Sequence, residues 1–146
     1  MRAHVACVAG ALLVAVGAPR AAALEEADPA SIAGTWQYRT QSNCGSVEGV
    51  GKLWFGWNAQ RELYDERGMV FWADTGSTIT WWGTARFDRR SRALRASVDN
   101  SLGDHVDSRW RIEGNPPARL IVRWTQTNGC HGVGIATRSA SWSPRR

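Results

Sequence analysis

The chain has 146 residues, with 18 Lys or Arg, 13 Asp or Glu and nine tryptophans. This length is typical of one domain, so a multidomain architecture is excluded. The basic excess consists almost entirely of scattered arginines, and their one dense internal group, Arg89, Arg90 and Arg92, is interpreted as a solvated turn rather than a nucleic-acid contact.

The first 23 residues have the layout of a secretory signal peptide. Arg2 supplies a positive start, an apolar run follows over residues 5–17, and three alanines at 21–23 form a cleavage site of the A-x-A kind. The run is shorter than the about 20 residues that span a bilayer. We therefore expect residues 1–23 to be removed and the mature protein to be periplasmic or secreted. Loss of Arg2 and Arg20 leaves 16 basic and 13 acidic residues, a net charge of +3.

The mature chain alternates apolar and polar residues with period two and shows no helical period. The pattern predicts eight strands, at residues 34–41, 49–58, 62–73, 77–87, 92–99, 105–113, 118–127 and 132–138. Gly68 is expected at a bulge or bend of the third strand. Eight short strands without crossover helices predict an all-β fold: a single eight-stranded antiparallel up-and-down barrel over residues 24–138, followed by a C-terminal tail at 139–146.

Removal of the signal peptide leaves two cysteines, Cys44 and Cys130. Export to an oxidising compartment predicts one disulfide between them. Two free thiols are the alternative, and a zinc site is disfavoured because His131 is the one histidine near either thiol in sequence. In a closed barrel with an even number of strands, the end of the first strand meets the start of the last. The disulfide is therefore expected to close the seam of the barrel.

Two similar phrases lead to these cysteines, RTQSNC at residues 39–44 and RWTQTNGC at residues 123–130. Asn43 and Asn128 are residues that favour turns, because their side chains bond to nearby backbone groups. We expect the two phrases to flank the disulfide, with both asparagines in the turns. Chance repetition of common polar residues is the alternative.

A Gly-x-Trp sequence, Gly34-Thr35-Trp36, begins the first predicted strand. In a small exported antiparallel barrel this resembles the calycin group, of the lipocalin and avidin type. In lipocalins a basic residue near the end of the last strand lies over that tryptophan, and the resemblance assigns this place to Arg138. The chain lacks the second Thr-Asp-Tyr motif of lipocalins and the ordered Trp motifs of avidins, so biotin binding is not implied.

The alternation also divides the tryptophans between the two faces of the predicted sheet. The side chains expected to face inward and to line a ligand site are Trp36, Tyr38, Trp57, Trp81, Trp110 and Trp124. An eight-stranded barrel has an interior just wide enough for side chains or one small ligand, so these rings either fill it or line one mouth. Trp54 and Trp82 are expected on the outer face, where they favour a partner surface.

Catalysis has few candidate residues. His105 lies between Asp104 and Asp107, but strand neighbours point to opposite faces. Glu62 and Glu66 would share a strand face, as two glycosidase carboxylates do, although solvated side chains are the simpler interpretation. No nucleophile elbow, phosphate loop or metal-ligand spacing is present in the sequence. We therefore predict a protein that is not an enzyme and needs neither a metal nor another cofactor.

The sequence thus favours an exported, non-catalytic binding protein that holds a small apolar or planar ligand in, or at the mouth of, a Trp-lined barrel. The alternative is an envelope interaction protein or enzyme inhibitor that binds a protein partner through outer residues such as Trp54 and Trp82. A secreted hydrolase is the third possibility. A transmembrane span is not expected, because the outward strand positions include Arg95, Asp107 and Arg123. A nucleic-acid partner is not expected either, because the mature net charge is small and the chain has a single dense internal basic group.

Overall fold

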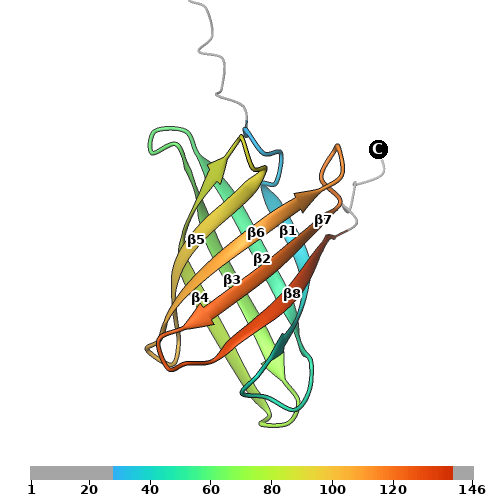
Figure 1. Ribbon diagram of the computed structural model, residues 1–146, viewed down its shortest axis with the longest axis vertical. Helices are drawn as coiled ribbons and strands as arrows, with labels where there is room; N and C mark the ends of the chain where they lie inside the picture. The colour runs from blue at the N-terminus through green and yellow to red at the C-terminus, as the bar shows by residue number, and fades with distance from the viewer. Residues whose placement is uncertain (1–27, 140–146) are drawn as a thin grey trace, which may run out of the picture.

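The computed structural model describes residues 28–139, so the predicted signal peptide and nearly all of the predicted tail lie outside the described residues. Within this range, eight antiparallel strands form one closed barrel in meander order (Figure 1). The strands are β1 (Gly34–Ser42), β2 (Gly49–Asn58), β3 (Leu63–Trp72), β4 (Ser77–Asp88), β5 (Ala93–Asn100), β6 (His105–Glu113), β7 (Arg119–Gln126) and β8 (His131–Arg138). The predicted fold class is confirmed, and every predicted strand end agrees with the observed one to within one residue. No helix in this part of the chain is both long enough and apolar enough to span a membrane.

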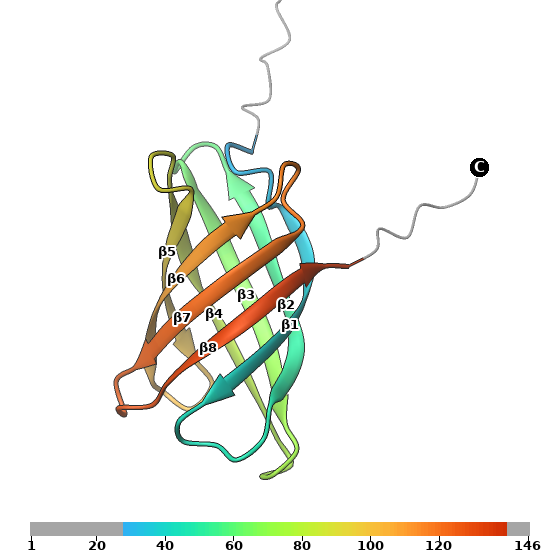
Figure 2. The same ribbon diagram turned by 45° about the vertical axis from the view of Figure 1, so that its right-hand side comes forward.

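The first and last strands pair along the seam of the barrel, where Figure 2 shows them side by side. Ser42 pairs with Gly132 at one end of this seam, and Cys44 and Cys130 lie just beyond it. Their Cα atoms are 5.6 Å apart and their sulfurs are bonded, which confirms the predicted disulfide. The bridge therefore joins two turns that are 86 residues apart in sequence.

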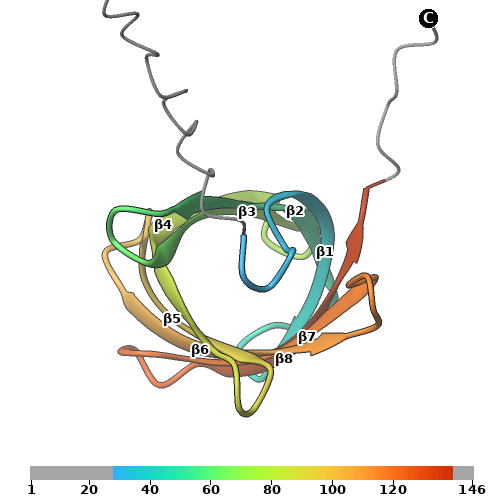
Figure 3. The same ribbon diagram turned by 90° about the horizontal axis from the view of Figure 1, so that it is seen from above.

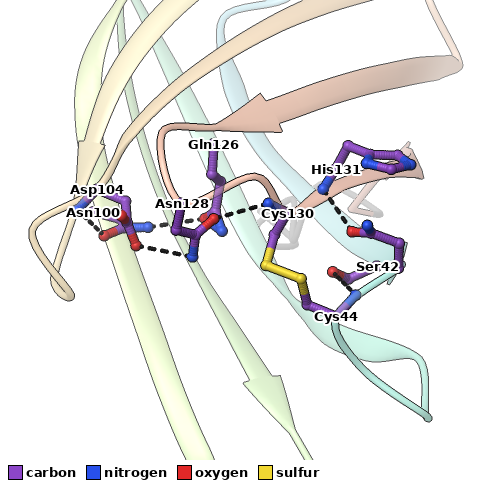
Figure 4. The surroundings of a disulfide bond; sticks show 9 residues. Ser42, Cys44, Asn100, Asp104, Gln126, Asn128, Cys130 and His131 are labelled. Carbon is purple, nitrogen blue, oxygen red and sulfur yellow. Dashed lines mark hydrogen bonds between the residues drawn. A yellow bond between two sulfur atoms is a disulfide. The ribbon is translucent and has the colours of Figure 1, made fainter.

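The asparagines of the two similar phrases occupy the turns beside this disulfide. The backbone N–H of His131 donates to Asn43 Oδ1 at 2.7 Å, across the seam. The backbone N–H of Cys130 donates to Asn128 Oδ1 at 2.9 Å, within its own turn (Figure 4). Both asparagines lie in turns beside the disulfide, as expected, but only Asn128 bonds within its own turn, whereas Asn43 links its turn to the start of the last strand.

Residues 28–33 lie across the opposite end of the barrel (Figure 3). The Asp28 carboxylate accepts the backbone N–H of Ala33 at 2.7 Å and the hydroxyl of Tyr64. Ile32 is fully buried, and its carbonyl accepts the indole N–H of Trp36 at 2.9 Å. This segment closes one end, because its apolar side chains pack on the barrel core while its polar groups bond to strand residues.

Arg138, in the last strand, holds this segment in place. Its guanidinium lies 4.5 Å from the ring centroid of Trp36, the position that the lipocalin resemblance implies. It donates hydrogen bonds to the carbonyls of Ser31, Ala33 at 3.1 Å and Pro117 at 3.3 Å. One side chain thus joins the N-terminal segment to β8 and to the β6–β7 turn.

Replacing Arg138 by Met should lower the free energy of unfolding by roughly 1–2 kcal/mol, because the carbonyl hydrogen bonds and the cation–π contact are lost. Urea unfolding followed by tryptophan fluorescence measures the change. Arg119→Met is the matched control, since Arg119 forms an exposed ion pair with Glu113 and such pairs contribute little. Equal losses in the two variants would show that Arg138 does not hold the closed end.

The half of the barrel next to the closed end is filled with side chains. Trp36, Phe55, Tyr64, Leu94 and Leu120 are all fully buried there and belong to one apolar cluster. Packing of this kind leaves no space for a ligand, so an interior site must lie toward the disulfide end.

Candidate functional site

A cavity of about 280 Å³ occupies the half of the barrel that carries the disulfide. Aromatic rings supply much of its wall, from Tyr38, Trp72, Trp81, Trp110 and Trp124. Aliphatic side chains such as Val98 and Val122 lie between these rings, and both cysteines of the disulfide are at its mouth. The barrel is therefore a cup: filled at one end and hollow at the other.

Four of the six predicted ligand-binding residues line this cavity, namely Tyr38, Trp81, Trp110 and Trp124. Trp36 faces inward but is fully buried in the filled half, against Ile32 and Arg138. Trp57 lies near the same end, with its ring centroid 4.9 Å from that of Tyr64. The prediction that Trp36 and Trp57 line the cavity is therefore wrong: Trp36 lies in the core and Trp57 packs beside it. Strand alternation predicts which face of the sheet a residue is on, but not how far along the barrel it lies.

The cavity stays open because two of its indoles lie over glycines on neighbouring strands. Trp81 pairs with Gly68, and a Cβ atom added to Gly68 would lie 2.0 Å from the Trp81 ring. Trp124 pairs with Gly132, where an added Cβ would lie 2.4 Å from the ring. Each ring takes the space of an absent side chain instead of projecting to the barrel axis. The predicted bulge at Gly68 is not present, since the pairing of this residue with both neighbouring strands is continuous.

The floor of the cavity holds a buried carboxyl group, that of Glu66 on β3. Its side chain is 2% exposed, and Trp81 Nε1 donates to Oε1 at 3.0 Å. Oε2 has no hydrogen-bond partner among residues 28–139. Burial raises the pKa of Glu66 to about 7, and the hydrogen bond from Trp81 opposes this shift without cancelling it. The Glu66 carboxyl group therefore gains or loses its proton near neutral pH, although it lies in a largely apolar wall.

Trp110 completes the floor with a second unsatisfied polar atom. Its side chain is buried, and within the described chain its indole N–H finds no acceptor. Its ring is held between Tyr38 and Phe55, with centroids 5.8 Å away in both cases. Burial also raises the pKa of Tyr38, so that hydroxyl stays protonated at neutral pH. The floor thus contains a carboxyl oxygen and an indole N–H that are both buried and both unpaired within the described chain, inside an aromatic surround.

Polar side chains surround the mouth of the cavity. Asn100 Nδ2 donates to Gln126 Oε1 at 3.0 Å (Figure 4). Asn100 Oδ1 accepts two backbone N–H groups of the β5–β6 turn. Asp74 accepts the backbone N–H and the hydroxyl of Ser46, which ties the β3–β4 turn to the β1–β2 turn. The mouth is consequently a ring of turns joined by hydrogen bonds and by the disulfide.

The outer face carries the two tryptophans expected there. Trp54 is 40% exposed and Trp82 is 52% exposed, and the Arg67 side chain lies between them in the strand register. Three further exposed apolar side chains, Val50, Met69 and Phe71, extend this surface along β2 and β3. We call these five apolar residues the β2–β4 outer patch.

The carboxylate pair considered from the sequence does not form. Glu62 lies in the β2–β3 turn with a φ of 51° and is exposed at the closed end, whereas Glu66 is buried inside the barrel. Among residues 28–139 no group of three or more His, Cys, Asp or Glu side chains could hold a metal ion.

His105 forms a polar cluster on the outer face instead. Its Nε2 lies 2.9 Å from Ser97 Oγ and its Nδ1 lies 2.8 Å from Asp99 Oδ1, the connectivity of a Ser-His-Asp triad. Asp107 Oδ1 also approaches Nε2, at 3.6 Å. None of these four residues lines the cavity. A nucleophilic role for Ser97 would require donors for an oxyanion beside it as well as this connectivity.

The hydrogen bond to Asp99 raises the pKa of the His105 imidazole above its ordinary range. In an NMR pH titration we expect Asp99→Asn to lower that pKa, because the neutral amide no longer stabilises the imidazolium. Asp65→Asn, an equal loss of charge on a distant part of the outer face, is the control and should leave it unchanged. A pKa of His105 that is the same in wild type and Asp99→Asn would contradict the assigned contact.

No family model and no curated protein matches the sequence. Its fold is similar to that of designed β-barrels. A redesigned β-barrel, mFAP0, bound to DFHBI, is 18% identical with a TM-score of 0.65 over 74% of this chain and 99% of that one. A second redesigned barrel, b11L5F_LGL, is 18% identical with a TM-score of 0.64 over 75% and 93%. A de novo designed fluorescence-activating β-barrel is 20% identical with a TM-score of 0.59 over 73% and 93%. At these identities the likeness establishes the eight-stranded barrel fold alone.

Proposed function

We propose that this chain is an exported, non-catalytic binding protein that holds a small apolar or planar ligand in its barrel cavity. The observation that carries the proposal is the cavity: one end of the barrel is filled with side chains, and the other contains about 280 Å³ of space with a wall rich in indole rings. This volume lies just below the usual range of small-molecule pockets, about 300–1,000 Å³. Such a space suits one small molecule that stacks on the rings.

Two further observations support a ligand-binding barrel. The contact between Arg138 and Trp36 follows the lipocalin resemblance, and we propose on that ground that the chain is of the calycin type. The redesigned barrels mFAP0 and mFAP1 are bound to DFHBI, a small planar dye, which illustrates that a barrel of this fold can bind a planar ligand. Both supports are analogies, and the cavity is the direct argument.

Filling the cavity tests the proposal. Naphthylmethanol, a neutral planar probe, should quench the intrinsic tryptophan fluorescence of the wild type in a saturable manner. Ser108 lines the cavity on β6, so Ser108→Phe should abolish saturable quenching by occupying the space. Thr78→Phe places the same ring on the exposed outer face of β4 and is the matched control, which should bind as the wild type does. No binding to the wild type, or equal binding to Ser108→Phe, would overturn the proposal.

The β2–β4 outer patch favours a second candidate function, the binding of a protein partner. Five large apolar side chains on three adjacent strands are 40% or more exposed, and contiguous patches of this kind mark interaction surfaces. Native mass spectrometry of protein purified from its own host should then reveal a partner that Trp54→Ser/Trp82→Ser loses and Ser108→Phe retains. A partner retained by the double variant would rule out the patch.

A further inference from the structure

We infer that the ligand of this cavity is an organic cation, an amine whose N–H groups bind Glu66 while its apolar or planar body stacks on the surrounding rings. The inference rests on the proposed function and adds to it the charge and the donor group of the ligand. Three independent features of the cavity carry it: an unpaired carboxyl oxygen, the sign of the lining charges and the aromatic faces around them.

The first feature is Glu66 Oε2. Buried polar atoms in folded proteins are almost always hydrogen-bonded, and leaving one unpaired costs about 1–3 kcal/mol. Oε1 already accepts the Trp81 indole N–H, which orients the carboxyl group and leaves Oε2 as the buried, unpaired acceptor beside the cavity. An ammonium group carries several N–H donors and no acceptor, so it satisfies this oxygen without leaving a new polar atom unpaired.

The second feature is the sign of the charge. The residues that line the cavity include two carboxylates, Glu66 and Asp74, and among them there is no Lys, Arg or His. The neighbouring strands present Phe55 and Gly83 beside Glu66, and neither titrates. Tyr38 on β1 is the titratable group that interacts with it across the barrel, and that hydroxyl is neutral. The charge of an ionised Glu66 is therefore not compensated within the lining, and a cation supplies the missing countercharge.

Arg138 is the cationic residue that could act as a countercharge for Glu66 from the inner side of the barrel, but it lies at the closed end. Its guanidinium stacks on Trp36 and bonds to carbonyls of the N-terminal segment. Trp36 is not part of the cavity wall, so the filled half of the barrel separates this arginine from Glu66.

The third feature is the aromatic surround. Tyr38 packs edge-on against Trp81, with centroids 5.6 Å apart, and lies 5.8 Å from the ring of Trp110. Aromatic faces attract cations, and the attraction grows when the site is shielded from water. A carboxylate inside an aromatic surround thus favours a cation over a neutral or anionic compound of the same shape.

Protonation of Glu66 gives the inference a pH dependence. Because burial holds its pKa at about 7, the empty cavity contains a mixture of neutral and ionised carboxyl groups at neutral pH. A bound ammonium group stabilises the ionised form and lowers this pKa. Cation binding should therefore be strongest above pH 7 and should weaken as protons compete for the carboxylate at lower pH.

Three probes of one shape test the inference: naphthylmethylammonium, naphthylmethanol and naphthoate, titrated by isothermal calorimetry. At about pH 8 the wild type should bind the ammonium at least about tenfold more tightly than the alcohol, and the naphthoate more weakly than both. In Glu66→Gln the ratio of ammonium to alcohol affinity should fall to near one. Asp65→Asn is the matched control on the outer face of the same strand, where Asp65 pairs with Arg61, and it should keep the wild-type ratio.

The wild type alone provides a second measurement that does not depend on a variant. Its ammonium-to-alcohol ratio should decline from about pH 8 to about pH 5 as Glu66 becomes protonated. Binding of the alcohol with no preference for the ammonium, in wild type at high pH, would overturn the cation inference and leave the proposed function standing. Failure of all three probes to bind would overturn the proposed function itself.

Discussion

Replacing Cys44 and Cys130 together by Ser should lower the free energy of unfolding by about 4–5 kcal/mol. The disulfide closes a loop that contains most of the described barrel, since its two cysteines are 86 positions apart in sequence, and it thereby restricts the unfolded chain. Urea unfolding of the oxidised wild type and of the double variant measures the difference. The hydrogen bond from the His131 N–H to Asn43 remains in the variant, so the seam should still pair when the protein is folded.

Reduction of the wild type is the control for this experiment, because it breaks the same bond without changing a side chain. Reduced wild type and the Ser variant should lose stability by similar amounts. A loss below about 1 kcal/mol in both would mean that the unfolded chain is already compact enough for the bridge to add little.

The second large effect concerns Glu66: in the ligand-free protein, its burial should make stability fall as the pH rises from about 4.5 to about 7. In this window the unfolded chain has released the proton of Glu66 while the folded chain still holds it. The folded state therefore binds more protons, and the free energy of unfolding decreases with pH. The shift from 4.5 to about 7 corresponds to a loss on the order of 3 kcal/mol.

Glu66→Gln isolates this effect, since the amide keeps the size of the side chain and cannot ionise. The difference in stability between Glu66→Gln and wild type should be small near pH 4 and should grow in favour of the variant up to about pH 8. Taking this difference removes the contribution of His105, whose raised pKa also lowers stability as the pH rises. Asp74, Asp88 and Glu113 have lowered pKa values and lose their stabilisation at acid pH, outside this window. A difference independent of pH would contradict the burial of an ionisable Glu66.

The sequence contained most of the information on the barrel. Period-two alternation and turn residues located all eight strands, because an antiparallel sheet with one wet face has that pattern. The disulfide followed from the count of cysteines and from the geometry of a closed meander, and the place of Arg138 over Trp36 followed from a resemblance in layout. These features depend on local pattern or on strand order.

The open cavity could not be predicted in the same way. Whether inward indoles fill a barrel depends on which residues oppose them, and the pairing of Trp81 with Gly68 and of Trp124 with Gly132 is a matter of register between strands. Depth along the barrel has no sequence signal either, so Trp36 could not be separated from Trp81 by alternation alone. The N-terminal segment at residues 28–33, which closes one end, is irregular, so it has no helical or strand periodicity that the sequence could reveal.

The sequence indicated Glu66 only as a possible partner of Glu62 in a carboxylate pair, and its buried place in the cavity was not predicted. The signal was present, since Tyr64, Glu66, Gly68, Val70 and Trp72 alternate along β3 and share the inward face. This alternation is hard to recognise because β3 is apolar on both faces near its end, where the outward Phe71 lies between the inward Val70 and Trp72. A carboxylate in such a run is most often solvated, and only the closed barrel makes this one buried.

The central claim is that an amine binds inside the barrel against Glu66. The most direct test is an NMR titration of protein labelled with carbon-13 at the glutamate carboxyls, with naphthylmethylammonium added at about pH 7. The account predicts that one carboxyl resonance, absent from Glu66→Gln, moves to its ionised position, and that probe protons show contacts to the indoles of Trp81 and Trp110. An unchanged Glu66 resonance, with probe contacts to Trp54 or Trp82 on the outer face, would contradict it.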